Sequence, residues 1–314
     1  MSFSFQAKNE MARVNAVRPC CQKAELAAML KMSGSLQINT GRLVLMVNTE
    51  NPAVARKVFK LFKSLYKLPI SVMMGKNSRL KKGNYYLVKA ELPKEKDSIL
   101  EELGIMRNGE LIYGVSQEIT RSRCCRRAYL RGAFLARGSV NRPEGNYHLE
   151  IIVPYPETAR DLCRMLEREK VKARPAERKQ THLVYIKDSE SIVDLLRLGG
   201  ANTSLLAFEN ARIVKSVRNQ VNRQVNCETA NLEKTVQAAM RQKELIEQLI
   251  EQFGLETIPE SWRDIGLLRV DYPDCSLKEL GAMLEPPMPK SGVAYRLRRL
   301  EELAQRLLPA DRLT

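Results

Sequence analysis

The sequence predicts an α+β protein with two related halves, each running helix–strand–strand–helix–strand–strand–helix, followed by an all-helical domain. A segment that begins at Cys20 recurs at Cys124, 104 positions later. After each copy, apolar residues change between the alternation of strands and the spacing of helices. Beyond residues 199–200 the short strands give way to long helical patterns. The predicted segments are two halves at 1–110 and 111–204, a helical linker at 205–257 and a C-terminal domain at 258–314.

The repeated segment is a helix that opens each half. Residues 20–26 read CCQKAEL, residues 124–130 read CCRRAYL, and both copies stay in register to the Gly-Ser pairs that follow. The first half then predicts a strand at 43–47, a helix at 52–66, strands near 70–74 and 85–88, and a helix near 98–103. The second half predicts a strand at 147–153, a helix at 156–168, strands near 171–174 and 182–186, and a helix near 189–198. Pro52 and Pro156 open matching helices, where proline is well tolerated.

The two repeated helices resemble degenerate LAGLIDADG motifs. Residues 26–34 read LAAMLKMSG and residues 130–138 read LRGAFLARG, each with small residues and a closing glycine. Small residues let two such helices pack closely across a pseudo-two-fold axis. The resemblance implies that each half offers a sheet to one side of a DNA duplex.

Enzymes with this motif carry an acidic residue just before the closing glycine, where it holds a divalent metal ion beside the scissile phosphates. Metal-assisted hydrolysis needs such oxygen ligands, but these positions hold Ser33 and Arg137. A fixed positive charge ~4 Å from a cation costs on the order of 4 kcal/mol per unit charge at an effective dielectric constant of about 20. Glu25 lies more than two turns earlier in its helix. We therefore predict that the chain is not an enzyme and has no cofactor, and that Arg137 contacts phosphate.

The chain has seven cysteines, and residues 1–14 lack the apolar run of a secretory signal, which predicts free thiols in a reducing cytoplasm. The adjacent pairs Cys20-Cys21 and Cys124-Cys125 stand at matched helix starts and could meet across the pseudo-two-fold axis. Adjacent cysteines do not match the C-x₂₋₄-C spacing of structural zinc sites. We therefore interpret them as small buried residues and predict no metal site.

The charge of the chain indicates a polyanionic partner, because the formal net charge is +16. Ten basic residues lie within 51–90 and six arginines within 121–140, and neither stretch contains an acidic residue. Aromatic residues make up 6% of the chain, too few for the base-stacking platforms of single-strand binders. We therefore predict double-stranded DNA as the partner, with Lys81 and Lys82 among the contacts. The alternative is a basic face that is only solvated.

The helical linker is rich in arginine and asparagine over residues 210–230. Both side chains can contact phosphates and base edges, and Arg223 is our candidate for such a contact. The alternative is a polar surface helix that bridges two domains.

Three helices are predicted in the C-terminal domain. The first helix spans 261–270 and is followed by a turn at 271–274. Its predicted apolar anchors are Trp262, Ile265, Leu267 and Leu268. Ser276 and Glu279 have the Ser-x-x-Glu form of a capping box, which opens the second helix. The prolines within 285–289 end that helix, because proline lacks an N–H group and fixes φ.

The third helix starts near Lys290 or Ser291 and is amphipathic. The predicted buried stripe is Val293, Leu297, Leu300, Ala304 and Leu307. The opposite face carries the candidate DNA contacts Lys290, Ser291, Tyr295, Arg298 and Arg299. This is the layout of a helix-turn-helix, whose last helix enters the major groove with its N-terminal residues on base edges. The alternative is a plain three-helix packing or dimer module.

The whole chain resembles the WhiA family of regulators from Gram-positive bacteria, over nearly all residues from about 2 to 308. The matching stretches are 24–35, 77–82, 124–139, 222–232 and 290–293, of which 222–232 (NRQVNCETANL) is the most specific. The resemblance implies a homing-endonuclease-like N-terminal fold without cleavage, joined to a helix-turn-helix similar to a promoter-reading sigma-factor domain. It also implies a role in sporulation, or in cell division and chromosome segregation.

We therefore interpret the chain as a sequence-specific transcription regulator that binds promoters, with RNA polymerase or another regulator as a candidate partner. We expect a cytoplasmic, nucleoid-associated protein with no small-molecule substrate. No segment approaches the ~20 apolar residues of a membrane span, so we expect no membrane partner. The alternative is a cell-division or chromosome-segregation scaffold that acts through protein partners. An active homing endonuclease is the least favoured hypothesis.

Overall fold

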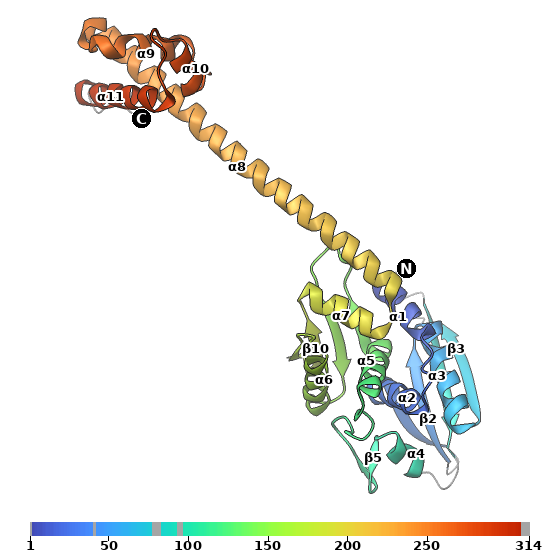
Figure 1. Ribbon diagram of the computed structural model, residues 1–314. Helices are drawn as coiled ribbons and strands as arrows, with labels where there is room; N and C mark the ends of the chain where they lie inside the picture. The colour runs from blue at the N-terminus through green and yellow to red at the C-terminus, as the bar shows by residue number, and fades with distance from the viewer. Residues whose placement is uncertain (1, 40–41, 77–82, 93–96, 309–314) are drawn as a thin grey trace. The chain divides into compact units, whose positions relative to one another are not determined.

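The computed structural model describes residues 2–39, 42–76, 83–92 and 97–308 (Figure 1). Lys81 and Lys82, which the sequence analysis selects as DNA contacts, lie outside these residues. The chain divides into two compact units, Met1–Ser216 and Val217–Thr314. Each unit has its own hydrophobic core.

Unit 1 contains both predicted halves, and the order of their elements confirms the repeat. The first half consists of α2 (Pro19–Ser33), β1 (Gly34–Asn39), β2 (Arg42–Thr49), α3 (Pro52–Tyr66), β3 (Ile70–Lys76), β4 (Asn84–Glu91) and α4 (Asp97–Glu102). The second half consists of α5 (Arg123–Arg137), β7 (Gly138–Val140), β8 (Leu149–Val153), α6 (Pro156–Arg168), β9 (Arg174–Arg178), β10 (Thr181–Ile186) and α7 (Ser189–Gly199). A helix, α1 (Phe3–Arg13), precedes the first half, and a hairpin of β5 (Met106–Arg107) and β6 (Glu110–Leu111) joins the two.

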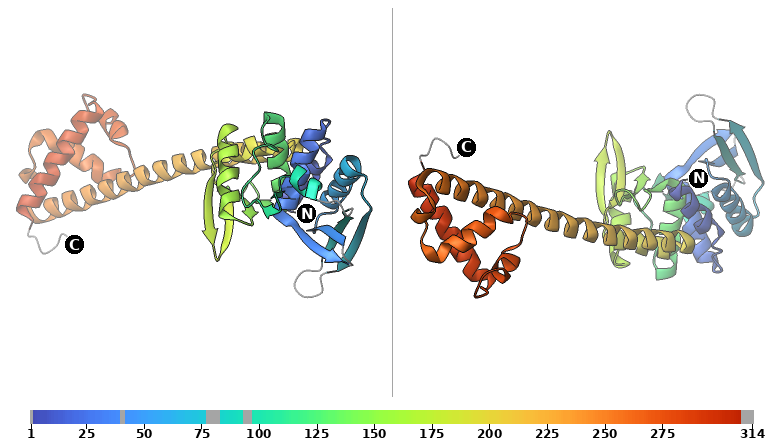
Figure 2. Two further views of the ribbon diagram at one scale, coloured as in Figure 1. Left: turned by 90° about the horizontal axis from the view of Figure 1, so that it is seen from below. Right: turned by 90° about the horizontal axis from the view of Figure 1, so that it is seen from above.

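Each half folds its strands into one antiparallel sheet, and the two sheets have equivalent strand orders. These orders are β1-β2-β4-β3 and β7-β8-β10-β9. The central helices α2 and α5 lie between the two sheets (Figures 1 and 2). The two halves share one continuous hydrophobic core and therefore form a single domain.

The structure differs from the sequence prediction at four elements of unit 1, namely β9, α1 and the two strands of the β5–β6 hairpin. β9 begins at Arg174, whereas the predicted strand at 171–174 is wrong, because Val171 is buried in the turn after α6. The sequence analysis did not identify α1, although Phe3, Ala7 and Met11 form a buried stripe with a spacing of four. It also did not identify the β5–β6 hairpin, which is too short to show a strand pattern.

The two central helices approach each other so closely that a glycine is required at the crossing. A Cβ atom built at Gly132 of α5 would lie 2.4 Å from the backbone oxygen of Glu25 and 2.9 Å from the Cβ of Ala28, both on α2. Real Cβ atoms do not come this close to other atoms. The small residues of the repeated motif therefore serve the contact that the sequence analysis predicted.

A buried ion-pair network crosses the same interface. Arg131 of α5 donates two hydrogen bonds of 2.9 Å to the carboxylate oxygens of Glu25 on α2. The Nζ of Lys57 on α3 lies 3.3 Å from the same carboxylate and also donates to the Val14 carbonyl. All three side chains are almost fully buried, and burial is the main cause that lowers the pKa of Lys57. One carboxylate therefore compensates two buried cations.

Unit 2 is helical, as predicted. α8 (Asn202–Phe253) crosses the boundary between the units, and α9 (Glu260–Asp271), α10 (Leu277–Ala282) and α11 (Lys290–Leu307) follow a short 3₁₀ turn, Leu255–Thr257. The core combines side chains from all four helices. They include Leu245, Ile246 and Leu249 of α8, Ile265 of α9, Leu280 of α10, and Val293, Leu297 and Leu300 of α11.

The local signals of unit 2 are mostly confirmed. Ser276 and Glu279 form the predicted capping box. The predicted burial of Leu267 and Leu307 is wrong, since they are 39% and 38% exposed, and Leu308 is buried instead of Leu307. Arg269, which was not among the predicted core residues, is buried and donates hydrogen bonds to the backbone carbonyls of the turn that precedes α10.

No helix in the described part of the chain is both long enough and apolar enough to cross a bilayer.

We expect Glu25→Gln to lower the free energy of unfolding by about 3–5 kcal/mol, because it leaves Arg131 and Lys57 buried without a charge partner. Chemical denaturation of the full chain measures this change. Glu118→Gln is the matched control, since its ion pair with Arg107 is exposed and is worth at most about 1 kcal/mol. Equal effects of the two substitutions would show that the buried network does not stabilise the fold.

Candidate DNA interface

The first candidate surface is one face of α11 in unit 2. The helix begins directly after Pro289, which has no polar side chain to cap the first turn. Gly292 and Val293 donate their N–H groups to the Pro289 carbonyl, so the N–H groups of Lys290 and Ser291 are the ones that can bind an anion. The stripe formed by Val293, Leu297, Leu300 and Ala304 is fully buried against the other helices. Burial of this stripe fixes which residues face outward.

The structure brings all five predicted contact residues of α11 to its exposed side. Lys290, Ser291, Tyr295, Arg298 and Arg299 are each exposed. They span about two and a half turns of one helix, with the lysine and the serine in its first turn. This is the arrangement that a helix inserted into a major groove requires, with the N-terminal residues presented first.

An acidic residue that the sequence analysis did not identify lies among these cations. Glu302 accepts a hydrogen bond of 2.8 Å from Arg299 and lies 3.4 Å from the Nε of Arg298. The Arg299 hydrogen bond is the main cause that lowers the pKa of Glu302. The signal was present in the sequence, because Glu302 follows the two arginines at i+4 and i+3, the spacing of helical ion pairs.

The side chains of Tyr295 and Arg299 also contact each other and hold each other in position. The Arg299 guanidinium lies 5.4 Å from the centre of the Tyr295 ring, and its Nε donates a hydrogen bond of 3.3 Å to the hydroxyl. Arg298 has a single ion-pair partner in the described residues, Glu302, and its side chain is 79% exposed. Arg298 is therefore the arginine that can reach a base edge with the least rearrangement.

The second candidate surface lies in unit 1, where α2 and α5 end at Ser33 and Arg137. The Ser33 hydroxyl donates to the Met29 carbonyl of its own helix. The exposed Arg137 lines a cleft of about 520 Å³, together with Ser33, Glu50 and residues of α1. The motif enzymes hold metal-binding carboxylates at these two positions. Here one position has the Ser33 hydroxyl, which is hydrogen-bonded to its own helix, and the other has the cation of Arg137.

Lys8 of α1 is a further cation at this cleft, and the sequence analysis did not identify it. Burial, and secondarily the charge of Arg137, lower the pKa of Lys8 to about 8, whereas Glu50 acts in the opposite direction. Two neighbouring positive charges that are not neutralised by one carboxylate favour an anion such as a phosphate.

Four of the six arginines in the run at 121–140 have carboxylate partners that the local charge count does not reveal. Arg131 is buried against Glu25. Arg123, Arg126 and Arg127 lie 3.3, 4.0 and 2.8 Å from the carboxylate of Glu169, which is almost fully buried. Likewise Lys57, one of the ten basic residues at 51–90, belongs to the buried network. These partners are distant in sequence, so a local count of charges cannot detect them.

The linker candidate, Arg223, lies in a stretch of α8 whose side chains are all exposed. Exposure is compatible with either of the two interpretations offered for this helix. Arg212, near the start of α8, instead pairs with Glu209 at 3.1 Å and bonds Ser189. The arginines of the linker are therefore not equivalent.

We expect the pH dependence of stability to report the burial of Lys8. Between pH 8 and 10.5 the unfolded lysine holds a proton that the folded one has lost, so stability rises with pH across this window. Lys8→Met should reduce the slope of unfolding free energy against pH by an amount that corresponds to at most one bound proton. Lys60→Met, which removes an exposed lysine of α3, is the charge-matched control. Unfolding curves recorded at a series of pH values test this, and identical slopes for Lys8→Met and the unsubstituted chain would contradict it.

Three family models match successive parts of the chain. The model described as the WhiA N-terminal LAGLIDADG-like domain matches residues 19–106, the WhiA LAGLIDADG-like domain matches 126–218, and the WhiA C-terminal HTH domain matches 221–304. Together they cover most of the two units described above.

Relatives match over almost the full length. The chain is 45% identical over 311 residues to the "Probable cell division protein WhiA" of Alkaliphilus metalliredigens, covering 98% of each chain. It is 49% identical over 308 residues to the protein of the same name in Desulfitobacterium hafniense, covering 98% of this chain and 96% of that one. Among solved structures, full-length WhiA from Thermatoga maritima matches with a TM-score of 0.61 and 26% identity, over 99% of this chain and 100% of that one. The repeated fold, the C-terminal helices and these matches lead to one conclusion: the chain belongs to the WhiA family.

Proposed function

We propose that this protein is a sequence-specific, double-stranded DNA-binding transcription regulator without nuclease activity. The observation that carries the proposal is the face of α11, where Lys290, Ser291, Tyr295, Arg298 and Arg299 are exposed opposite a fully buried stripe. In this proposal Arg298 and Arg299 read base edges in the major groove. Arg to guanine is the commonest specific contact of this kind.

The platform of unit 1 supplies affinity rather than chemistry in this proposal. Arg137 and Lys8 form a cationic cleft where the motif enzymes bind metal ions, and Arg cannot coordinate a cation. Phosphate contacts by such cations hold the protein on DNA without reading sequence. Arg223 and the lysine pair at 81–82 are further candidates for phosphate contact.

The names of the relatives connect this activity to cell division. We propose that the protein controls division genes at their promoters, where it associates with the nucleoid in the cytoplasm and meets RNA polymerase or another regulator. Roles in sporulation and chromosome segregation are further proposals that rest on the family resemblance.

We expect Arg298→Ala to weaken binding to a specific site by ~1–3 kcal/mol and to change binding to random DNA much less. Arg137→Ala is the contrasting variant, because loss of one phosphate contact should weaken both complexes alike and reduce the salt slope by about 0.9. Titration of each variant with both DNAs at several salt concentrations measures these effects. Equal losses on both DNAs for Arg298→Ala would reject the base-reading role.

The specific site can be found by genome-wide crosslinking and immunoprecipitation of the intact protein. The double variant Arg298→Ala/Arg299→Ala is compared in the same cells. Sharp promoter peaks that vanish in the double variant support a regulator whose last helix reads sequence. Diffuse binding that is the same in both proteins would reject it.

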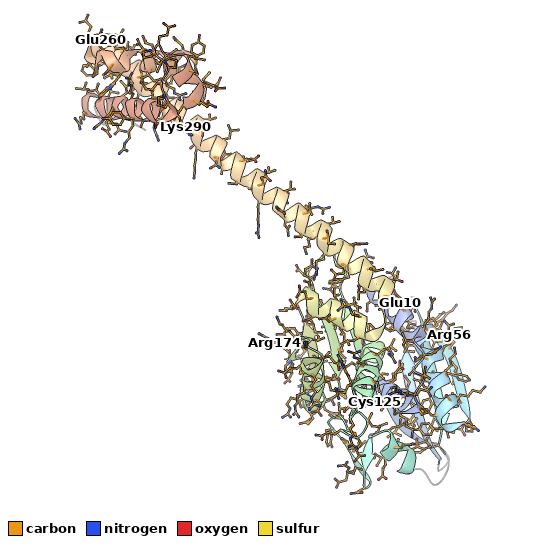
Figure 3. The ribbon with its side chains drawn as sticks, viewed as in Figure 1. Glu10, Arg56, Cys125, Arg174, Glu260 and Lys290 are labelled. Atoms are coloured by element: carbon orange, nitrogen blue, oxygen red, sulfur yellow. The ribbon has the colours of Figure 1, made fainter. Side chains whose placement is uncertain are left out.

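Glu302 gives an independent test, because its carboxylate must release the arginines when they contact DNA. We expect Glu302→Gln to tighten binding to DNA, since it removes a negative charge and frees two guanidinium groups. Glu260→Gln, which removes an exposed carboxylate from α9, is the charge-matched control (Figure 3). If both substitutions tighten binding equally, only net charge matters and the arrangement on α11 does not.

A scaffold role is the second candidate function, and one observation favours it. α8 exposes a row of apolar side chains at intervals close to helical turns, which is typical of a surface that binds another helix. The row includes Val217, Val221, Val225, Leu232 and Val236, all in unit 2. The double variant Val221→Asp/Val225→Asp tests this role. Impaired cell division with unchanged promoter peaks would favour the scaffold.

A further inference from the structure

The two adjacent cysteine pairs come together at the point where α2 and α5 begin. Cys20 and Cys21 are the second and third residues of α2, and Cys124 and Cys125 occupy the same positions in α5. All four Sγ atoms lie within 4.8 Å of one another, and none is in a disulfide. Figure 3 shows Cys125 at the junction of these helices. Among the described residues, this is the one place where such ligands gather closely enough to hold a metal ion.

The spread of the sulfur atoms suits a single tetrahedral ion. With Zn–S bonds of about 2.3 Å, four thiolates around zinc lie about 3.8 Å apart. The observed limit of 4.8 Å therefore requires each sulfur to move by less than about 1 Å. Two of the thiols, Cys21 and Cys125, are buried, whereas Cys20 is exposed and Cys124 is half-buried. The site thus has a dry interior and an open side through which an ion can enter.

Groups that favour negative charge lie beside the Cys124 sulfur, whereas burial raises the pKa of Cys21 and of Cys125. Both pairs occupy the first turn of a helix, where the helix dipole is positive. The Arg18 guanidinium lies 4.0 Å from the Sγ of Cys124, and the Ser122 hydroxyl lies 3.2 Å from it. Groups that hydrogen-bond the ligand sulfurs are the usual second layer around a metal ion.

We propose that Cys20, Cys21, Cys124 and Cys125 bind one zinc ion, which joins the starts of the two central helices. The thiols that bind release their protons, and the four sulfur ligands complete the coordination sphere. With no position left for water, the ion is structural and does no chemistry. The site lies about 20 Å along the helices from the cleft at Ser33 and Arg137, so it is separate from the DNA-contacting surface.

The four cysteines reach one another through the fold and not through the spacing of a zinc-binding loop. A C-x₂₋₄-C motif lets one short loop supply two ligands, and each cysteine pair taken alone lacks that spacing. The repeat places two pairs on facing helices instead, so the fold supplies the geometry that a loop would otherwise provide.

The test is metal analysis of the full chain, expressed with zinc and purified under reducing conditions without chelators. We expect about one zinc per chain, lost in Cys20→Ser/Cys124→Ser and retained in the control Cys163→Ser/Cys227→Ser/Cys275→Ser, which leaves the four cysteines intact. Because Cys20 and Cys124 are the accessible members of the group, circular dichroism should show the same helix content in both variants.

Binding of cobalt provides a second measurement, which does not depend on how much zinc the protein retains through purification. Co²⁺ added to the zinc-free chain should produce the intense absorption of tetrahedral cobalt–thiolate coordination, and zinc should abolish it. Three results would overturn the proposal: no bound metal with all thiols free to react, a disulfide between the helices in protein alkylated at cell lysis, or the visible spectrum of an iron–sulfur cluster.

Discussion

The contact between α2 and α5 is the constraint on which the rest of unit 1 depends. Its closeness is set by Gly132, where any side chain would overlap the backbone of α2. Glu25 holds the contact together by pairing with Arg131 across it and with Lys57 beside it. Because these groups are buried, the helices cannot slide or separate without stranding a charge in the core. Both sheets are attached to these two helices, so their mutual placement follows from the same contact.

The same pair of helices also determines what each end of unit 1 can do. At their starts the helices bring four thiols together, and at their ends they present Ser33 and Arg137. A nuclease of this fold would need carboxylates at the second of these places. The acidic residue that is nearest in the repeat, Glu25, is committed to the buried network. Glu25 therefore stabilises the contact between the two helices, and the carboxylate that lines the cleft at their ends is that of Glu50.

Much of the fold could be predicted from the sequence, because the repeat and the capping signals are local. The pattern of α2 recurs in α5, and Ser276 with Glu279 marks the start of α10 without reference to anything distant. β9 could not be placed, because its mostly exposed side chains lack an alternating pattern. On α11 the exposed face was predictable, since Val293, Leu297 and Leu300 define the opposite one.

The charge pattern was harder to interpret than the fold. Glu169 lies more than forty residues after the arginines that it binds, and Lys8 reaches its cleft from α1, a helix that was not predicted. Ion pairs with residues that are distant in sequence decide whether a basic side chain is available to a ligand. Such ion pairs are seen only in the three-dimensional structure. Glu302 is the exception, because its arginines are one helical turn away.

The Glu25–Arg131 pair is not repeated in the symmetry-related position of the two halves. At the repeat offset of 104, Glu25 corresponds to Tyr129 and Arg131 corresponds to Ala27. Two copies of the first half would therefore set glutamate against alanine, and two copies of the second would set arginine against tyrosine. Two copies of the second half would therefore leave Arg131 without an opposite charge, whereas two copies of the first half would leave each Glu25 with Lys57 alone. The two halves are therefore equivalent in fold but not in the charges that they bring to their contact, because the Arg131–Glu25 pair needs one residue from each half.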